Sequence, residues 1–398
     1  MSVASATWRR QRIVAAPAPP ASAFAGSDRE VSCAAVVTEA DPLAEHWADL
    51  RARAASANFY QSYEWCSAWT RSCARAGRPE ALRIVTVWEG RRLVLLWPLT
   101  MRRTGPVRVL HALGEPATQY CDLLVEASPN ASTWFAKAWA CLIETDDVDA
   151  VHMKHVRRHS ALERLKPVRH RWIMVSTKAS PYLVKTADPS KRLGLRSRSG
   201  RSRNALKRHM KNLMRIGDVT FEAVPRSQHT VAVRAALDLK ARWLEARGLA
   251  SAGYLHPGNE NTILTLAAKG HFMIRRLRVG DETAAVEIGV LDRGHYYSMI
   301  QSYDQRFAVH SPGRLLLSHM LESDDGIETF DFLPPSLPHK TEWTQSFEGV
   351  ADYVVPLTLR GRLMAAYLKA IRPRLAGTFE VLPASLRRRL SRLKTFFY

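Results

Sequence analysis

Apolar residues recur along the first half of the chain with the spacings of helices and strands. Helices are predicted over 45–76, in two pieces, and over 131–144. Shorter apolar or alternating runs predict strands over 81–88, 92–99, 107–113 and 148–156. Glu89-Gly90 is the turn of a hairpin between the first two strands. This pattern indicates a mixed α/β domain.

The second half gives a related pattern. It predicts helices over 199–216, 228–247 and 312–322, and strands over 272–279, 283–291, 294–301 and 327–333. Helices, antiparallel strands, a helix and a last strand, in this order, predict an α+β domain with its chemistry near the last strand-to-helix junction. Both halves share a helix-then-hairpin order, so a duplicated domain is one interpretation.

Composition excludes several classes of protein. Of 398 residues, 46% are hydrophobic and 24% charged, which is typical of a globular chain rather than a disordered or fibrous one. The longest apolar run, Leu93 to Leu99, is far shorter than the roughly 20 residues that span a bilayer. Prolines 17, 19 and 20 interrupt the Ala-rich N-terminus, which favours a disordered tail over a signal segment; a twin-arginine signal is the alternative.

We therefore expect four segments. They are a disordered Ala/Pro-rich tail over 1–30, an N-terminal domain over 31–180, a C-terminal domain over 181–358 that includes a basic helix at 196–216, and a basic amphipathic tail over 359–398.

The charge is concentrated in two places. The chain has 58 Lys and Arg against 37 Asp and Glu, a net charge of +21. Residues 191–215 hold ten basic residues and no acid, and residues 361–398 hold nine basic residues and one acid. Such a local excess indicates either a footprint for nucleic acid, anionic lipid or a phosphorylated ligand, or two solvated faces of an Arg-rich protein. A helix over 384–397, with Leu386 and Leu390 on one face, would lie on a membrane surface or pack on its own domain.

Cysteine and histidine spacings argue against metal sites and disulfides. The five cysteines include no C-x-x-C pair, which fits a reducing, cytoplasmic location. His152, His155 and His159 lie around a predicted strand, whose side chains alternate between faces, so we expect no metal there.

The sharpest local signal is the start of the helix at 312–322. Ser311 is a favoured N-cap, Pro312 suits the first turn, and Gly313 lets a ligand approach the backbone. Arg314 stands where a capping box would place Glu or Gln, and Leu315 would bury one side of the helix. The free N–H groups of this helix start predict a phosphate site; an ordinary Ser-Pro-capped helix is the alternative.

A family resemblance rests on a series of short segments in order. They are Asn58 to Trp65, Arg92 to Leu99, Leu113-Gly114 with Tyr120 to Leu124, the basic helix, Tyr303-Asp304, Ser311 to Leu316, Asp331 to Leu333, and Lys340 with Trp343. Together they resemble GNAT-superfamily acetyltransferases of the BioF2-like or CelD/BcsL type, related in fold to the FemABX peptidyltransferases. The resemblance covers about 31–355. His339, where an aromatic residue often precedes the lysine, and Leu333-Pro334-Pro335, in place of a Gly-containing loop, depart from the family pattern.

The resemblance implies two tandem GNAT-like domains with mixed, largely antiparallel sheets. It also implies direct acyl transfer from acetyl-CoA or another acyl-CoA, without a metal, to an amino or hydroxyl group. The expected acceptor is a sugar or a polysaccharide or cell-envelope precursor, as in cellulose or exopolysaccharide biosynthesis. Backbone N–H groups beside a splayed strand would polarise the thioester carbonyl, and Ser311 to Leu315 would bind the CoA pyrophosphate.

Four residues are candidates for catalysis. Glu287 interrupts an apolar strand, where a carboxylate either faces a cleft as a general base with a raised pKa or pairs with an arginine. Tyr303 would protonate the leaving thiolate or serve only in packing. Asp331 and Lys340 would bind the acceptor or a phosphate, or pair with each other.

Two other functions remain open from the sequence. The basic helix fits a FemABX-like transferase that takes its acyl group from aminoacyl-tRNA. The amphipathic tail over 384–397 fits a peripheral contact with anionic membrane, and with it a non-catalytic scaffold of a polysaccharide synthase.

Overall fold

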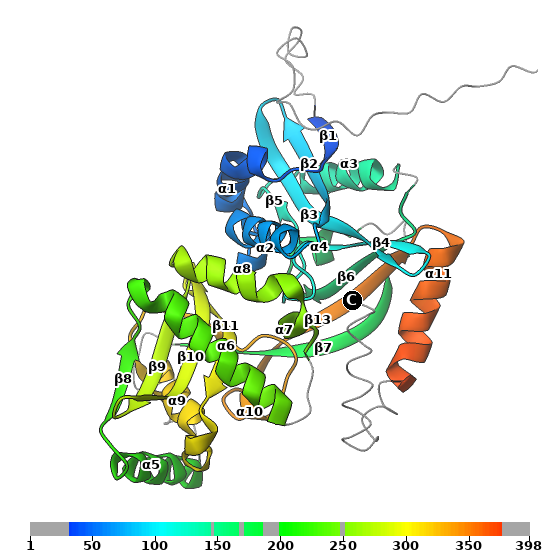
Figure 1. Cartoon of the computed structure of the whole chain (residues 1–398). Coiled ribbons are helices and arrows are strands. Elements are labelled where there is room, and N and C mark those ends of the chain that lie inside the picture. The colour runs from blue at the N-terminus through cyan, green and yellow to red at the C-terminus, as the bar shows by residue number, and fades with distance from the viewer. Residues whose placement is uncertain (1–31, 145–146, 167–170, 186–198, 247–250, 376–398) are drawn as a thin grey trace, which may run out of the picture.

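The computed structural model describes residues 32–144, 147–166, 171–185, 199–246 and 251–375, and Figure 1 shows their arrangement. The tail predicted over 1–30 and the helix predicted over 384–397 lie outside the described residues. Among those described, the backbone forms a large curved sheet with helices packed on both faces.

The N-terminal half follows the sequence pattern closely. Its elements are β1 (Ser32–Val37), α1 (Ala44–Arg53), α2 (Tyr63–Arg75), β2 (Ala81–Glu89), β3 (Arg92–Thr104), β4 (Val107–Ala112), β5 (Leu124–Val125), α3 (Ala131–Ile143), β6 (Ala150–Arg157), α4 (Ala161–Leu165) and β7 (Ile173–Val184). The first helical region divides in two, as predicted, because Asn58 caps a short 3₁₀ turn and Ser62 then caps α2.

The C-terminal half repeats this order. Its elements are α5 (Gly200–Met214), β8 (Val219–Ala223), α6 (His229–Ala246), α7 (Ala252–Leu255), α8 (Pro257–Ala268), β9 (Met273–Val279), β10 (Glu282–Asp292), β11 (His295–Tyr303), the 3₁₀ helix η7 (Gln305–His310), α9 (Pro312–Glu322), β12 (Thr329–Asp331), α10 (Pro338–Thr341), β13 (Ser346–Pro356), α11 (Leu359–Ala366) and the π turn η8 (Tyr367–Ile371). The strand predicted over 327–333 is shorter, because Leu333 adopts a positive φ of 61° that ends extended pairing.

The same strand pairing recurs in both halves. In the first, β1 to β4 form an antiparallel meander and β6 then lies parallel to β4. In the second, β8 to β11 form the meander and β12 lies parallel to β11. The other paired strands of the described chain run antiparallel. The fold is thus two GNAT-like units with mixed, largely antiparallel pairing.

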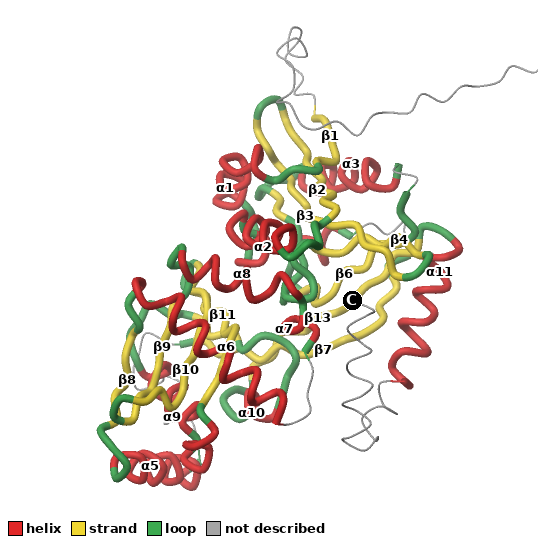
Figure 2. The backbone as a smooth tube through the Cα atoms, in the orientation of Figure 1, coloured by secondary structure: helices red, strands yellow, loops and turns green. Residues whose placement is uncertain are grey.

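The two units exchange their last strands. After β6, the chain reaches β7, which pairs with β12 of the second unit. After β12, it reaches β13, which pairs with β6 of the first unit, and β7 and β13 also pair with each other. The described residues thus form one thirteen-stranded sheet, and Figure 2 shows β6, β13 and β7 curving between the halves. The domain boundary predicted at residue 180 falls inside β7.

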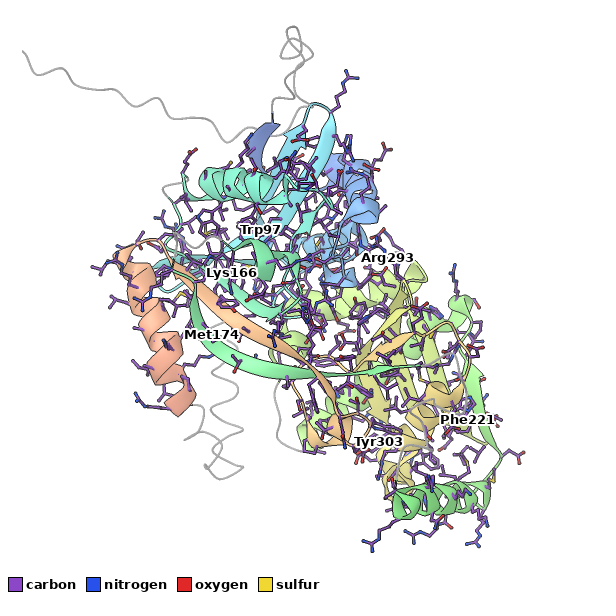
Figure 3. All side chains as sticks on the ribbon, turned by 180° about the vertical axis from the view of Figure 1, so that it is seen from behind. Trp97, Lys166, Met174, Phe221, Arg293 and Tyr303 are labelled. Atoms are coloured by element: carbon purple, nitrogen blue, oxygen red, sulfur yellow. The ribbon has the colours of Figure 1, made fainter. Side chains whose placement is uncertain are left out.

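Buried side chains join the halves as well. One cluster contains Trp65 and Trp69 of α2, Leu266 of α8, and Ile288 and Tyr297 of the second meander. A second cluster packs α9 under β9 to β12, and a third packs α3 against the first meander. Figure 3 shows side chains filling both faces, with Trp97 in the first half and Phe221 beside α5.

Two observations bear on membrane-spanning helices and on the state of the cysteines. Within the described residues, no helix is long and apolar enough to traverse a lipid bilayer. Cys66, Cys73, Cys121 and Cys141 are free thiols.

Gly289 is required by the bulge between β10 and β11, where the register shifts at Ile288/Gly289. A Cβ at Gly289 would overlap the backbone oxygen of Tyr297 and the ring of Tyr296. We expect Gly289→Ala to lower the free energy of unfolding by about 2–3 kcal/mol, measured by urea denaturation. Gly349→Ala on β13 is the matched control, since nothing lies within 4 Å of its Cβ position. Equal effects of the two changes would contradict this account.

Candidate active site

The parallel strands β11 and β12 separate halfway along β11. Their pairing covers His295 with Thr329, Tyr296 with Phe330 and Tyr297 with Asp331, whereas β11 continues to Tyr303. Beyond Asp331 the chain turns toward β7, and the Phe332 N–H donates to the Pro181 oxygen. Beyond Tyr297, therefore, β12 does not pair with that edge of β11. The family resemblance implied a splayed strand, and this separation is the place in the sheet where one could act.

Asp331 lies at the point where the strands separate and is buried. Its carboxylate accepts hydrogen bonds from the Tyr120 hydroxyl at 2.8 and 2.9 Å, from His295 Nε2 at 3.1 Å and from the Leu333 N–H at 2.8 Å. Ser180 Oγ lies 3.4 Å from Asp331 and 2.6 Å from the Tyr120 hydroxyl. Burial and the Asp331 charge raise the pKa of Tyr120 well above its usual range, so its phenol remains a donor.

Lys340 reaches Asp331 through the backbone of one residue. Its Nζ donates to the Leu333 oxygen at 2.7 Å, and the Leu333 N–H donates to Asp331. Leu333 holds a left-handed conformation that a leucine rarely adopts, and these two bonds fix it. Burial lowers the pKa of Lys340 to about 8, although Asp331 acts in the opposite direction. Direct pairing of Asp331 with Lys340 was one of the alternatives left open by the sequence, and the structure connects the two through the backbone of Leu333 instead.

Glu287 is buried on β10 and is not bonded to an arginine. Its carboxylate accepts a hydrogen bond from Ser298 Oγ at 2.6 Å and a long one from the Tyr296 hydroxyl at 3.4 Å. Burial raises the pKa of Glu287 to about 8 against the opposing effect of these bonds. The raised pKa agrees with one of the two sequence interpretations, but the exposure to a cleft does not, because the side chain is enclosed.

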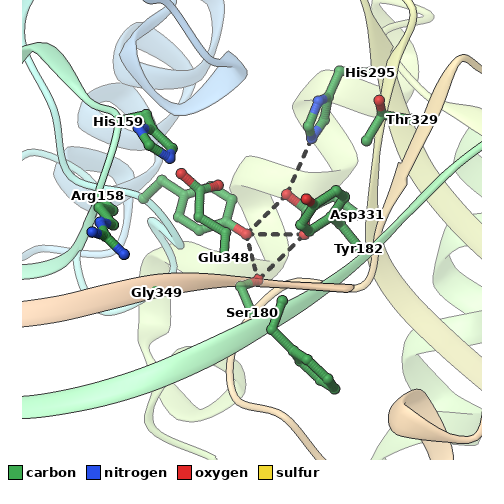
Figure 4. A pocket seen from close by; sticks show the side chains of 11 residues that line it. Arg158, His159, Ser180, Tyr182, His295, Thr329, Asp331, Glu348 and Gly349 are labelled. Atoms are coloured by element: carbon green, nitrogen blue, oxygen red, sulfur yellow. Dashed lines mark hydrogen bonds and ion pairs between the residues drawn. The ribbon is translucent and has the colours of Figure 1, made fainter. Parts of the chain in front are cut away.

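A cavity of about 330 Å³ opens beside Asp331, between the two units. It is lined by Tyr120, Arg158, His159, Ser180, Tyr182, His295, Thr329, Asp331, Phe347, Glu348 and Gly349. Arg158 and His159 enter from the side opposite His295 and Thr329, as Figure 4 shows. Because β7 and β13 form its floor, the strand exchange builds this cavity from both halves. Burial raises the pKa of Glu348, partly offset by Arg157.

The start of α9 lies at the other end of β11. A Cβ on Gly313 would lie 3.9 Å from the Tyr303 ring, so the two predicted residues are neighbours. Tyr303 also accepts a hydrogen bond from Trp243 Nε1 at 3.3 Å. Six strand residues, about 20 Å, separate Tyr303 from Tyr297 and hence from the level of Asp331. The sequence placed Tyr303 and Asp331 in one reaction centre, but the extended strand keeps them apart.

The predicted serine cap does not form. Ser311 has a φ of 51°, and its side chain makes no capping bond. Pro312 has no N–H, and the N–H groups of Arg314 and Leu315 donate to the Ser311 oxygen. Gly313 supplies the N–H left over in this first turn, while Leu315 is part of the buried core. Arg314 pairs with Glu342 at 3.0 Å.

Positive charge gathers around this helix start. The basic helix α5 packs near η7 and α9. Arg208, His310 and Arg314 lower the pKa of His209 in addition to the effect of its partial burial. A ligand that carries negative charge is therefore favoured at this end of β11.

Among the described residues, Cys73, Glu80 and His256 are close enough together to be considered for a metal. Glu80, however, accepts hydrogen bonds from Trp69 at 2.8 Å and Thr100 at 2.7 Å and pairs with Arg102. Burial raises the pKa of Cys73 to about 12, which keeps the thiol protonated. The group is an ion pair beside a neutral thiol and does not fit a metal.

Sequence reasoning missed the partners of Asp331. Tyr120 was part of the family resemblance without a role, and nothing in the sequence marks Ser180 or Glu348, which lie on strands that the pattern did not predict. His295 directly follows the Arg293-Gly294 turn, and a histidine at the start of a buried strand was the available signal.

Residues 200–341 match the family model of the acetyltransferase (GNAT) domain. This segment of the chain is therefore similar to a GNAT acetyltransferase domain. All four catalytic candidates and the start of α9 lie inside the matched segment, whereas Tyr120, Ser180 and Glu348 lie outside it.

Solved structures show the same fold over most of the chain. FemX aligns with a TM-score of 0.57 at 10% identity, over 81% of this chain and 98% of FemX. A conserved protein of unknown function from Bacteroides thetaiotaomicron VPI-5482 aligns with a TM-score of 0.51 at 10% identity, over 79% of this chain and 97% of that protein. The match therefore extends across both GNAT-like units. A search of curated protein sequences gave no significant match.

The buried carboxyl of Glu287 makes stability depend on pH. The folded protein keeps this proton up to about pH 8, whereas an unperturbed glutamate releases it near 4.5. Between these values the folded state binds more protons than the unfolded state, so stability falls as pH rises. The wild type should lose on the order of a few kcal/mol of unfolding free energy between about pH 5 and pH 8, measured by urea denaturation at each pH. Glu287→Gln should not show this loss, because the amide has no proton to release.

The control for this measurement is Glu245→Gln on the exposed side of α6. It should keep the wild-type dependence on pH. If Glu287→Gln and Glu245→Gln follow the same curve, the buried carboxyl does not hold its proton as described.

Proposed function

We propose that the protein is an acyltransferase that uses an acyl-CoA, most simply acetyl-CoA, and acylates an amino or hydroxyl group. The observation that carries this proposal is the separation of β11 from β12 at Asp331, inside a GNAT domain and beside a polar cavity. A thioester reaching the splayed edge from one side would meet an acceptor held in the cavity on the other.

The donor would bind with its phosphates at the start of α9. The Gly313 N–H and the positive charge of α5 and Arg314 support a negatively charged group there. From this end the pantetheine arm would follow the unpaired edge of β11, about 20 Å from Tyr303 to Tyr297. Tyr303 would then contact the phosphate end of the donor, rather than the leaving sulfur as the sequence suggested.

The acceptor would occupy the cavity next to His295 and Asp331. A carboxylate hydrogen-bonded to one imidazole nitrogen fixes the tautomer and strengthens the other nitrogen as a base. His295 bonds Asp331 through Nε2, which leaves Nδ1 to take the proton of the acceptor. Tyr120 and Ser180 are hydrogen-bonded to each other, and together they would hold Asp331 in this orientation.

The proposed acyl transfer forms one bond and breaks another. The acceptor nitrogen or oxygen attacks the thioester carbon, its proton passes to His295, and the carbon–sulfur bond breaks with the electron pair on sulfur. Lys340, with a pKa of about 8, is matched to the pKa of roughly 8.5 of an ordinary thiol and would protonate the leaving thiolate. Glu287 keeps its proton at neutral pH, so it would organise Ser298 rather than act as the base.

A sugar or a polysaccharide or cell-envelope precursor is the acceptor class that we propose. The volume of about 330 Å³ is at the lower end for ligand sites and suits one small polar group. Carboxylates of Asp331 and Glu348 suit amino and hydroxyl groups, and Tyr182 and Phe347 offer rings against which a sugar could pack. The reaction would take place in the cytoplasm, where acyl-CoA is supplied.

A second candidate is transfer from aminoacyl-tRNA, as in a FemABX-like enzyme. The observation that favours it is α5, whose Arg201, Arg203, Lys207, Arg208, Lys211 and Arg215 are all exposed. This helix lies near η7 and α9, so a phosphate backbone bound along it would reach the same end of β11.

Loss of the Asp331 carboxylate tests the reaction centre. We expect Asp331→Asn and His295→Gln each to lower kcat/KM at least about a hundredfold, because each removes the oriented base. Combined, they should cost little more than either alone. The assay follows release of the CoA thiol and the mass increase of an amino-sugar acceptor. Asp281→Asn on an exposed turn is the control; unchanged kcat/KM in Asp331→Asn would refute this centre.

The identity of the donor is tested by calorimetry with acetyl-CoA and by filter binding with aminoacyl-tRNA. Gly313→Val should weaken acetyl-CoA binding at least about tenfold, because a branched side chain covers the free N–H. Replacing Arg203, Lys207 and Arg208 with Ala removes part of the positive charge beside α9 and should weaken acetyl-CoA binding less than Gly313→Val does. No heat with any acyl-CoA, together with salt-sensitive tRNA binding that the triple variant abolishes, would assign the donor to aminoacyl-tRNA instead.

A further inference from the structure

The helix formed by α11 and η8 is apolar on two opposite faces. Its inner face packs on the sheet through Met364, Ala365 and Leu368, beside Val354 and Ile173. Its outer face carries Leu359, Leu363, Tyr367, Ile371 and Leu375, which are between 44% and 71% exposed. A globular surface helix normally presents polar residues outward. An exposed apolar stripe of this length therefore indicates that something covers it.

The stripe stays aligned along the helix. Its members are four residues apart, which in an α-helix is slightly more than one turn. The π turn over Tyr367–Ile371 is wider and turns less per residue, so it offsets part of this drift. We name the five residues the outer stripe.

Basic residues flank the outer stripe, and acids are absent from it. Arg360 and Arg372 project on one side of the stripe in helical angle, and Arg362 and Arg374 project on the other. Residues 359–375 include no Asp or Glu. Long basic side chains beside an apolar stripe are the arrangement of a helix that lies in the headgroup region of a membrane, with its cations extended to the phosphates.

The rest of the fold presents this helix rigidly. Thr358 caps it by accepting from the Gly361 N–H, and the Thr358 hydroxyl donates to Asp149 at 2.7 Å. Gly361 fits closely, since a Cβ there would overlap the Asp149 backbone oxygen. Figure 1 shows α11 at the edge of the molecule beside β4 and β13, with its outer side directed away from the sheet.

We propose that the outer stripe of α11 and η8 docks the protein on an anionic lipid surface. Charge decides between the occupants. The chain beyond residue 375 has five basic residues and one acid, and a second copy would bring the same cations, so both would repel this face. Nucleic acid would satisfy the cations but leave the apolar stripe in water. Anionic lipid would pair with the cations and also remove the apolar stripe from water. This inference is independent of the proposed reaction.

The test is co-sedimentation of the full chain with vesicles of phosphatidylcholine, with and without phosphatidylglycerol. We expect binding only to the vesicles that contain phosphatidylglycerol. Leu363→Glu with Ile371→Glu should weaken binding at least about tenfold, since each change removes one inserted apolar side chain. Arg362→Gln with Arg374→Gln should weaken binding to phosphatidylglycerol vesicles and reduce its dependence on salt.

Matched controls separate this surface from the others. Ile216→Glu with Val231→Glu makes the same change in charge at exposed apolar residues far from α11 and should bind as the wild type does. A chain ending at residue 375 should also bind. Circular dichroism confirms that each variant is folded.

Four outcomes would overturn the proposal. They are the absence of binding by the wild type, wild-type binding by Leu363→Glu/Ile371→Glu, loss of binding only when residues 376–398 are removed, and a wild-type dimer that Leu363→Glu/Ile371→Glu converts to a monomer. The third would assign the anchor to the terminal segment, and the fourth would assign the stripe to a second copy.

Discussion

The pairing of β7 with β12 and of β13 with β6 is the constraint on which the rest of the molecule depends. Each unit has a meander, a helix and a parallel strand, but neither closes its own sheet. The exchanged strands satisfy the open edge of each parallel strand with backbone hydrogen bonds from the other unit. They also lay down the floor of the cavity, so the candidate active site exists only because both units are present.

Within this frame, polar groups are buried where hydrogen bonds can satisfy them. Asp331 receives donors from the distant Tyr120 and His295 and from the nearby Leu333 N–H, which offset the cost of removing a carboxylate from water. Glu287 has fewer donors, and it is the carboxyl whose pKa rises to about 8. The surroundings of these two acids therefore differ, and we assign them different roles in the proposed reaction.

Local pattern predicted most of the repeated elements, because each meander strand carries its own periodicity and turn residues. The strands β7 and β13 escaped prediction, since Lys178, Ser180 and Pro181 in one and Glu348, Gly349 and Asp352 in the other break the apolar alternation. Their stability comes from partners far along the chain rather than from their own composition. Tyr120 and Asp331 meet across 211 residues, a distance that no motif spacing records. The sequence did mark Glu287, Asp331 and the start of α9, because an acid in an apolar strand and a Ser-Pro-Gly helix start are local signals.

The exchanged strands also set the order in which the protein can mature. β6 and β13 are separated by nearly two hundred residues, so the first unit acquires its final neighbour only after most of the second unit has been synthesised. Contacts of such long sequence separation slow folding and leave strand edges uncovered meanwhile. For the same reason the GNAT segment, excised from the chain, would carry β12 without β7. Neither unit carries a complete sheet without the other. A sequence change in an exchanged strand must therefore be compatible with the packing of both units.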